Sequence, residues 1–299
     1  MVIPTHLFES RIHRRTAILG AAAFVLQGLS ARAASTVAPR VAAIDWAAAE
    51  TLTAVGITPI AIADLPGFRA SFAHLPDTAG TIDLGSTWEP NFELLDRLKP
   101  DLIYLPSWSS LSRAQLEQIA AVRLCDIHGR GGDPIEKARS FGESVVNELT
   151  TMSEPSAIRQ LEARLQRITG KTSPRPVFLL NLRSTSRFVN VYAAGSLPDS
   201  ALMHVGLQNA WQGPVNGFGF ASIGAEKLLQ SPDASIVILN QNGRTTEMLS
   251  RLEHNIFWTS MPALRAGRVH VSPPISVFGG LLSATTFAEW LADTFDKAT

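Results

Sequence analysis

One pattern occurs twice in this chain, once in each half, and it constrains the fold more than any other feature. In the first half, a helical segment containing Glu93 leads to a break at Pro100, and an apolar run follows. In the second half, a helical segment containing Glu226 leads to a break at Pro232, and a second apolar run follows. A helix, a proline break and an apolar strand, repeated in this way, predict two lobes of similar construction.

The stretch between the two halves, residues 153–171, predicts one amphipathic helix. Its apolar side chains recur at helical spacing and form a single stripe, made of Ile158, Leu161, Leu165 and Ile168. Ser153 suits the N-cap, Pro155 suits the first turn, and Gly170 suits the end of the helix. We therefore predict an N-terminal lobe over residues 34–152, an interlobe helix over 153–171, and a C-terminal lobe over 172–299.

Residues 1–33 have the pattern of an export signal. The pair Arg14-Arg15 precedes an apolar run, 17–29, that is too short to span a bilayer, and a small-x-small cleavage pattern follows at 31–33. The arginine pair resembles a twin-arginine signal, and the alternative is an ordinary secretory signal with a chance arginine pair. Either signal predicts a mature protein that begins near Ala34 and works in the periplasm.

Composition excludes several classes of function. Lys and Arg total 26 and so do Asp and Glu, so the formal charge is zero and a basic face for nucleic acid is not expected. The single cysteine, Cys125, lies in a predicted strand and cannot form an internal disulfide, so we expect an inert buried thiol. No two of the 7 histidines stand at metal-ligand spacing, so we predict no metal site in the protein and no cofactor.

Strands alternate with helical segments in both halves, which predicts parallel sheets and an α/β class for each lobe. Segments 113–122 and 223–230 are predicted helices, and the stretch 68–72 is a predicted loop. Ligands of such sheets collect beyond the carboxyl ends of the strands. The residues at these predicted ends include Trp46, Trp88, Trp108 and Arg183, which are mostly aromatic and seldom charged.

Further motifs identify the family that this chain resembles. They are Ala43-Ile-Asp-Trp46, residues 47–57, Trp88-Glu-Pro-Asn-Phe-Glu93, Asn209-Ala-Trp-Gln-Gly213, residues 257–268 and Leu282-Ser-Ala-Thr-Thr-Phe287. Together they resemble the substrate-binding proteins of iron-siderophore, haem and vitamin B12 importers, and specifically the ferric hydroxamate type. The resemblance implies a bilobal fold with a single bridging helix (the class III arrangement), a ferric siderophore as ligand, and delivery to an inner-membrane ABC permease with its ATPase.

The same resemblance implies which residues bind the ligand. An arginine and a tyrosine of the family, which hydrogen-bond the hydroxamate oxygens, correspond to Thr87 and Ser109. The aromatic wall of the family corresponds to Trp46, Ser71, Phe218, Ser276 and Phe278, so only part of it is kept. Trp88, Trp108, Phe72 and Arg183 are the candidates that would rebuild the site, with Arg187 as a second possible polar contact. Otherwise the ligand is a different chelate.

Two glutamates are implied contacts with the permease. Glu93 and Glu226 occupy equivalent points in the two lobes, where acidic residues of the family form salt bridges with permease arginines. The alternative is that both are solvated glutamates in the first turn of a helix, where the helix dipole favours them. A binding protein of this family is expected to be a monomer that holds iron only through the siderophore.

Alternatives remain open for the tryptophans and for the function. Trp46 is expected at the ligand, Trp88 and Trp108 at the ligand or in packing, and Trp211, Trp258 and Trp290 in packing. The same fold with haem or a corrinoid as ligand is the second hypothesis. A periplasmic α/β hydrolase is the third, although neither Gly-x-Ser-x-Gly nor a metal triad is present.

Overall fold

The computed structural model describes residues 39–72, 75, 78–129, 131–149, 156–183, 187–241 and 243–296. Residues from 39 onward form one compact unit. The predicted export signal, residues 1–33, lies outside the described residues, as do Ser153 and Pro155. Among the described helices, none combines the length and the apolar character needed to cross a bilayer.

The first lobe contains a parallel sheet. Its strands are β1 (Val41–Ala43), β2 (Ala61–Ile62), β3 (Ile82–Asp83), β4 (Leu102–Pro106) and β5 (Ala121–Cys125), in the order β3-β2-β1-β4-β5. Its helices are α1 (Trp46–Ala54), α2 (Leu65–Ser71), α3 (Phe92–Leu98) and α4 (Arg113–Leu116). The chain leaves β1 toward β2 on one side and reaches β4 on the other, so the strand order reverses between β1 and β4. Such a reversal opens a crevice at the carboxyl ends of the two strands.

The second lobe contains a mixed sheet. Its strands are β6 (Pro176–Leu182), β7 (Phe188–Tyr192), β8 (Gln208–Asn209), β9 (Phe220–Gly224), β10 (Ser235–Asn240) and β11 (Val269–Pro274), in the order β11-β10-β6-β7-β9 with β8 beside β6. Its helices are α7 (Leu197–His204), α8 (Gly243–Leu252), α9 (Ile256–Thr259) and α10 (Pro262–Arg265), with the 3-10 helix η1 (Ala225–Gln230).

The expectation of purely parallel pairing is wrong for this second sheet. Strand β7 runs antiparallel to both β6 and β9. The physical reason is the short connection between β6 and β7, which has no room for the crossover helix that a parallel pair needs. The segment 223–230 is also not one helix, because Ile223 and Gly224 pair with β7 and only the residues after them turn into η1.

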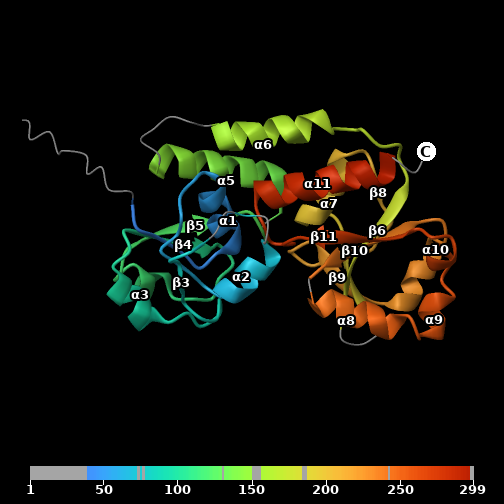
Figure 1. Ribbon diagram of the computed structural model, residues 1–299, viewed down its shortest axis with the longest axis horizontal. Helices are drawn as coiled ribbons and strands as arrows, with labels where there is room; N and C mark the ends of the chain where they lie inside the picture. The colour runs from blue at the N-terminus through green and yellow to red at the C-terminus, as the bar shows by residue number, and fades with distance from the viewer. Residues whose placement is uncertain are drawn as a thin grey trace, which may run out of the picture. The chain divides into compact units, whose positions relative to one another are not determined.

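Helices α5 (Pro134–Leu149), α6 (Ser156–Arg167) and α11 (Leu281–Asp296) form a layer along one side of both sheets (Figure 1). The stripe predicted for α6 is confirmed, because Ile158, Leu161, Leu165 and Ile168 are all buried. Helix α6 packs on α5 and α11 and then leads into β6. It ends at Arg167, before the predicted end at residue 171, because the chain turns over residues 168–170.

The core is continuous between the lobes. One buried cluster extends from β1 and α1 through α5, α6 and α11 to β6 and β10, while separate clusters fill the outer face of each sheet. Glu50 of α1 is fully buried within this region, where its carboxylate accepts hydrogen bonds from the backbone N–H groups of Gly280 and Ser283 at the start of α11. The first lobe therefore caps the helix that closes the second.

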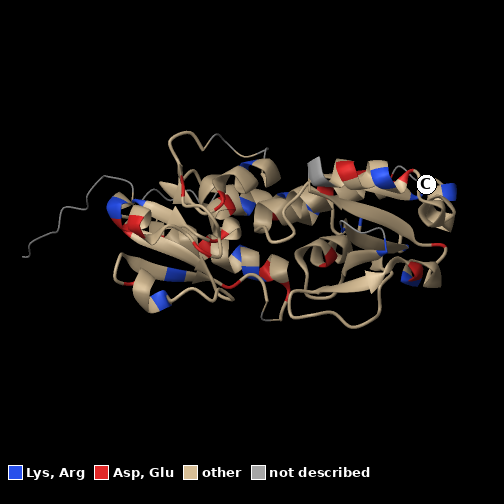
Figure 2. Ribbon diagram, turned by 90° about the horizontal axis from the view of Figure 1, so that it is seen from below, with Lys and Arg blue, Asp and Glu red and all other residues tan. Residues whose placement is uncertain are grey.

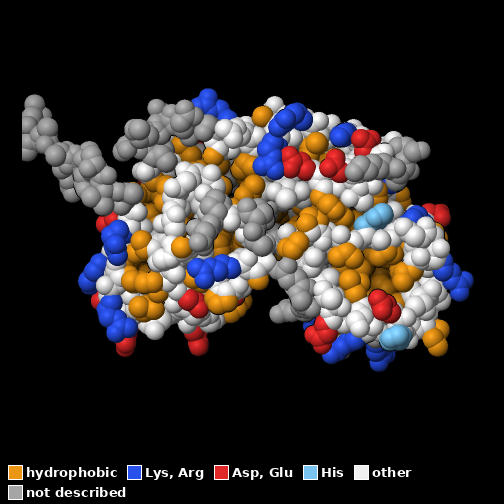
Figure 3. Space-filling model, in the orientation of Figure 1, with side chains coloured by type: hydrophobic (Ala, Val, Ile, Leu, Met, Phe, Trp, Pro, Cys, Tyr) orange, Lys and Arg blue, Asp and Glu red, His pale blue; other side chains and the backbone are white. Residues whose placement is uncertain are grey.

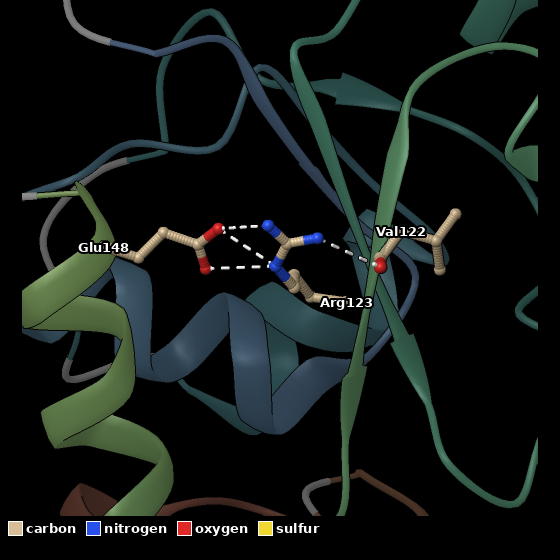
Figure 4. Close-up of polar contacts among 3 residues, drawn as sticks. All are labelled: Val122, Arg123 and Glu148. Carbon is tan, nitrogen blue, oxygen red and sulfur yellow. Dashed lines mark hydrogen bonds and ion pairs between the residues drawn. The ribbon is translucent and has the colours of Figure 1, made fainter.

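Ion pairs connect the helical layer to neighbouring elements. Figure 4 shows Arg123 of β5 facing Glu148 of α5, with the guanidinium Nη2 at 2.6 Å and Nε at 2.9 Å from the carboxylate Oε1. Positive and negative residues are interspersed over the described part of the chain (Figure 2). Ion pairs at this exposure contribute little individually and mainly fix the position of an edge strand.

Replacing Arg164 with glutamine is expected to lower the free energy of unfolding by about 0.5–1 kcal/mol. Its Nε and Nη2 donate to the two carboxylate oxygens of Glu289 at 2.9 and 2.6 Å and so join α6 to α11, but both side chains are about one-third exposed. Urea denaturation of Arg164→Gln, Glu289→Gln and the double variant would measure the coupling. Strictly additive losses would show that the pair contributes nothing.

Two other helices differ from the sequence-based expectation. The stretch predicted as a loop around 68–72 is helix α2, which Asp64 caps by accepting a hydrogen bond from the Gly67 N–H at 3.2 Å. The predicted helix 113–122 is only the single turn α4, because the chain from Ala121 pairs with β4 as strand β5. Tertiary pairing overrides helix propensity in the second case.

Candidate ligand-binding site

A cavity of about 400 Å³ lies at the crevice that the strand order predicts. Its first-lobe wall comes from residues at or just after the carboxyl ends of β1, β2, β4 and β5 and from the loop after β3. Its second-lobe wall comes from the loop before β9 and the loop after β11. The described lining residues are Ile44, Asp45, Trp46, Asp64, Thr87, Trp88, Pro106, Trp108, His128, Phe218, Phe220 and Phe278. Hydrophobic side chains also reach the surface in patches on the face seen in Figure 3.

Four aromatic side chains form a continuous row across the cavity, which we call the aromatic row. Trp88 lies 5.6 Å from Trp108, measured between ring centroids. Trp108 meets Phe218 edge to face at 5.8 Å, and Phe218 meets Phe278 in the same way at 5.9 Å. The row passes from the first lobe to the second, and such edge-to-face pairs are favoured by the ring quadrupoles.

Trp46 has a fixed orientation in the first-lobe wall of the cavity. Its indole Nε1 donates a hydrogen bond to the Ala63 carbonyl at 2.8 Å. The ring packs edge to face against Phe68 and Phe72, each 6.2 Å away. Because its polar atom and one edge are already engaged inside the first lobe, Trp46 presents its remaining apolar surface to the cavity.

Burial shifts the pKa of two polar residues in the wall. Asp45 caps α1, accepting from the Ala48 N–H at 2.7 Å, and burial raises its pKa to about 6. His128 is buried against Phe278, and its Nε2 lies 2.9 Å from the Gly279 carbonyl oxygen. A carbonyl can only accept, so Nε2 carries the hydrogen. Burial lowers the pKa of His128 to about 4, and the ring is therefore neutral at pH 7.

The cavity brings together six of the eleven ligand residues predicted from the sequence. These are Trp46, Thr87, Trp88, Trp108, Phe218 and Phe278. The remaining five are absent from its described lining: Ser71, Phe72, Ser109, Arg183 and Ser276. Phe72 packs behind Trp46 in the core, Ser276 is buried, and the Ser109 hydroxyl accepts from the Leu111 N–H at 3.1 Å.

Arg183 lies outside the described lining of the cavity. Leu179 of β6 is level with Tyr192 of β7, which is level with Phe220 at the cavity. Arg183 stands four residues further along β6, about 13 Å away along the strand. There it is exposed and donates to Asn190 Oδ1 at 3.3 Å. Arg187 follows in the same hairpin and also lies outside the described lining of the cavity.

Asp64 and His128 are cavity residues that sequence reasoning missed. Asp64 has a signal that could have been used, since an aspartate two residues before a proline is typical of a helix start. That signal places Asp64 at the end of β2, beside the β1 crevice. His128 had no such signal, because its place in the wall depends on the contact with the second lobe.

Glu93 and Glu226 occupy matching positions, one in α3 and one in η1, each before a proline break and a strand. Both are exposed. The breaks are built alike, since Arg40 donates to the Leu98 carbonyl at 2.6 Å and Arg268 donates to the Pro232 carbonyl at 2.9 Å. Glu226 also borders a second hollow of about 360 Å³.

The described residues hold no group of three or more His, Cys, Asp or Glu side chains arranged to bind a metal ion. Three tryptophans outside the cavity pack as the sequence predicts. Trp258 is buried in the second-lobe core, Trp211 packs against the same cluster, and Trp290 stacks on Phe287 at 5.9 Å.

Two α/β lobes that enclose an aromatic cavity between them are characteristic of a solute-binding protein. The chain matches the family model for periplasmic binding proteins over residues 41–275, and it belongs to that family. This confirms the fold class and the family that the sequence motifs indicate. Because the family consists of substrate-binding proteins, the chain is a binding protein and the hydrolase alternative is not supported.

Individual relatives are similar over nearly the whole chain. The iron(3+)-hydroxamate-binding protein FhuD of Escherichia coli strain K12 is 28% identical over 270 residues, which cover 88% of each protein. The structure of FhuD from Vibrio cholerae with Fe3+-Desferal has a TM-score of 0.75 at 22% identity and covers 87% of this chain and 98% of that one. The triscatecholate siderophore binding protein FeuA of Bacillus subtilis has a TM-score of 0.65 at 17% identity, with coverages of 86% and 92%.

Proposed function

We propose that this protein binds a ferric hydroxamate siderophore in the aromatic cavity and delivers it to an inner-membrane ABC permease. The observation that carries the proposal is the combination of a hydroxamate-binding relative over 88% of the chain with a cavity walled by aromatic side chains. The apolar outer surface of a ferric chelate packs well against such rings.

The polar contacts of the site differ from the family pattern. Thr87 lines the cavity, and it stands where the family has arginine. Ser109 stands where the family has tyrosine, and its hydroxyl is engaged with the backbone of Leu111. A threonine hydroxyl forms a weaker hydrogen bond to a hydroxamate oxygen than a guanidinium does. Apolar packing therefore supplies a larger share of the binding energy in this protein.

Iron is held through the siderophore, with no protein ligand to the metal. Haem is the second candidate because His128 lies in the cavity wall. Its Nε2, however, donates to the Gly279 carbonyl across the two lobes, and burial keeps the ring neutral. An axial bond to iron through Nε2 would break that contact, which favours a siderophore over haem.

Delivery would use Glu93 and Glu226, whose matching exposed positions suit a two-point contact with arginines of the permease. Exposed ion pairs add orientation and specificity more than affinity. The protein would reach the periplasm by the twin-arginine route and act there as a monomer.

The test is a titration of the mature protein with a ferric hydroxamate, a ferric catecholate and haem, followed by tryptophan fluorescence. The proposal expects saturable quenching by the hydroxamate at the lowest concentration. A Soret shift on haem addition, without quenching by any hydroxamate, would transfer the assignment to haem. Tighter binding of the catecholate would contradict the hydroxamate class and leave the family unchanged.

Replacing Trp108 with alanine is expected to weaken hydroxamate binding at least tenfold, or about 1.4 kcal/mol. Trp108 occupies the middle of the aromatic row, so its removal exposes Trp88 and Phe218 to water in the bound state. The matched control is Trp290→Phe, which removes a tryptophan that packs on Phe287 away from the cavity. Equal affinities of the two variants in calorimetry would show that the row does not contact the ligand.

A further inference from the structure

The turn that carries Phe278 to the cavity lies in the second lobe, directly before α11. A hydrogen bond from the Gly279 N–H to the Ser276 carbonyl, at 3.1 Å, closes this turn. Phe278 is half-buried and lines the cavity, and its ring meets Phe218 of the aromatic row at 5.9 Å. The position of the turn therefore decides where one end of the aromatic row stands.

Two side chains of the first lobe bind the residues that follow this phenylalanine. The carboxylate of Glu50, on α1, accepts hydrogen bonds from the N–H groups of Gly280 and Ser283. The Nε2 of His128 donates to the Gly279 carbonyl at 2.9 Å, and its ring packs edge to face against the phenylalanine of the turn at 5.4 Å. We call these five residues the interlobe clasp: Glu50, His128, Gly279, Gly280 and Ser283.

The two glycines of the interlobe clasp allow this close approach. A Cβ added to Gly279 would lie 2.7 Å from Glu50 Oε2, which is too close for a carbon and an oxygen atom. A Cβ added to Gly280 would lie 3.1 Å from Thr51 Oγ1 and 3.4 Å from the Ala47 carbonyl oxygen, both on α1. All five residues of the clasp are buried. The turn is therefore fitted against the first lobe by backbone contact as well as by hydrogen bonds.

Resting on the proposed function, we infer that Glu50 is a positioning residue for ligand binding, which holds the turn so that Phe278 stands in the aromatic row before the ligand arrives. Glu50 is absent from the described lining of the cavity, so it acts on the ligand through Phe278. A wall that already has its bound conformation loses less conformational freedom when the ligand binds. Without the clasp, the ordering of Phe278 would be subtracted from the binding free energy.

The first arm of the test replaces Glu50 with glutamine and measures the affinity of the mature protein for Fe3+-Desferal by calorimetry at pH 8. Glutamine has one acceptor oxygen, so the N–H of either Gly280 or Ser283 would face an NH2 group and the turn would loosen. We expect the affinity to fall by about fivefold or more. Burial raises the pKa of Glu50 to about 7, so its charge at pH 8 opposes folding, and glutamine removes that charge. The loss of affinity should therefore appear without a loss of stability.

Met248→Ala is the matched control for stability. Met248 of α8 is buried in the second-lobe core, in a cluster that contains no residue of the interlobe clasp, and its truncation leaves a cavity there. We expect this variant to unfold more easily than the wild type and to bind Fe3+-Desferal within about twofold as tightly. An equal loss of affinity in Met248→Ala and Glu50→Gln would show that affinity follows overall stability, and would overturn the role of Glu50.

The second arm tests the route through Phe278. In the Phe278→Ala background, Glu50→Gln should change the affinity by less than about twofold, because the ring that the clasp positions is gone. In the Thr87→Ala background its full effect should remain, since Thr87 lines the cavity from the loop after β3, on the first lobe. An undiminished effect in the Phe278→Ala background would show that Glu50 acts by another route, and would overturn the inference.

A measurement without ligand separates this inference from the function on which it rests. With trifluoromethylphenylalanine in place of Phe278, fluorine NMR should show one sharp resonance in the otherwise unaltered chain and in Met248→Ala. In Glu50→Gln the resonance should broaden or divide. Identical spectra would overturn the positioning role whether or not a siderophore binds, whereas the expected spectra without binding of Fe3+-Desferal would overturn the proposed function alone. Should Glu50→Gln fail to fold, Glu50→Asp, which draws the carboxylate back by one methylene, replaces it in every arm.

Discussion

Replacing Glu50 with alanine is expected to lower the free energy of unfolding by about 3–5 kcal/mol. The carboxylate is fully buried and accepts from the N–H groups of Gly280 and Ser283. Alanine would leave two buried donors unsatisfied at the start of α11 and a void between α1 and α11. Chemical denaturation followed by circular dichroism would measure the loss.

Two further variants test whether that loss comes from the buried hydrogen bonds of Glu50. Glu50→Gln keeps one acceptor oxygen and most of the volume, so at pH 5, where Glu50 is protonated, a smaller loss of about 1–2 kcal/mol is expected. Glu143→Ala removes an exposed glutamate from α5 and should change stability by less than about 0.5 kcal/mol. Equal stabilities of Glu50→Ala and Glu143→Ala would show that the capping of α11 by the first lobe contributes nothing to the free energy of unfolding.

The contribution of Glu50 to the free energy of unfolding should also depend on pH. Burial raises its pKa from 4.5 to about 7, so between these values the folded state binds a proton that the unfolded state has released. The stabilisation is therefore full below pH 4.5 and is lost as pH rises to 7, by about 3 kcal/mol. Asp45 acts in the same direction and His128 in the opposite one. The difference between the wild type and Glu50→Gln cancels both, and it should fall from pH 5 to pH 8. A constant difference would contradict the raised pKa.

Replacing Gly219 with alanine is expected to cost more than about 3 kcal/mol and to displace Phe218 from the cavity. Gly219 has φ +75°, and an added Cβ would clash with the backbone of Gly195 and Ser196. These are main-chain atoms held at the start of α7, so they cannot rotate away. The loop that carries Phe218 would have to move as a whole.

Gly217 is the matched control on the other side of Phe218. An added Cβ there would meet the Gly129 carbonyl oxygen at 3.5 Å, an ordinary contact. Gly217→Ala should therefore change stability by less than about 1 kcal/mol. Thermal denaturation and hydroxamate affinity would be measured for both variants. Equal behaviour would show that the loop adapts to a side chain at Gly219.

Local patterns in the sequence were sufficient for much of the fold. The stripe of α6 could be predicted because burial on one face requires apolar residues at helical spacing. Strands β4 and β10 could be predicted because both are continuous apolar runs after a proline break. The direction of β7 could also have been predicted, because its connection to β6 is too short for the crossover helix of a parallel pair, but parallel pairing was assumed for the whole lobe.

Only some residues of the candidate site could be predicted from the sequence. Trp46, Trp88 and Trp108 could be predicted because they follow strands whose ends face one crevice. Arg183 also follows a strand, but it stands four residues beyond the point of β6 that is level with Phe220, and it is absent from the described lining of the cavity. Phe218 and Phe278 were found through the resemblance alone. Asp64 could have been predicted from its position as a helix cap. His128 could not, because its place in the wall depends on its contact with the second lobe.

The burial of Cys125 makes the protein convenient for thiol labelling. It is the single cysteine of the chain, it is 2% exposed, and burial beside Asp45 raises its pKa, so it stays protonated and unreactive toward maleimides. A cysteine pair introduced on the surface, one in each lobe, would accept two fluorophores without removal of the native residue. Single-molecule energy transfer could then follow the separation of the lobes in the otherwise unaltered chain.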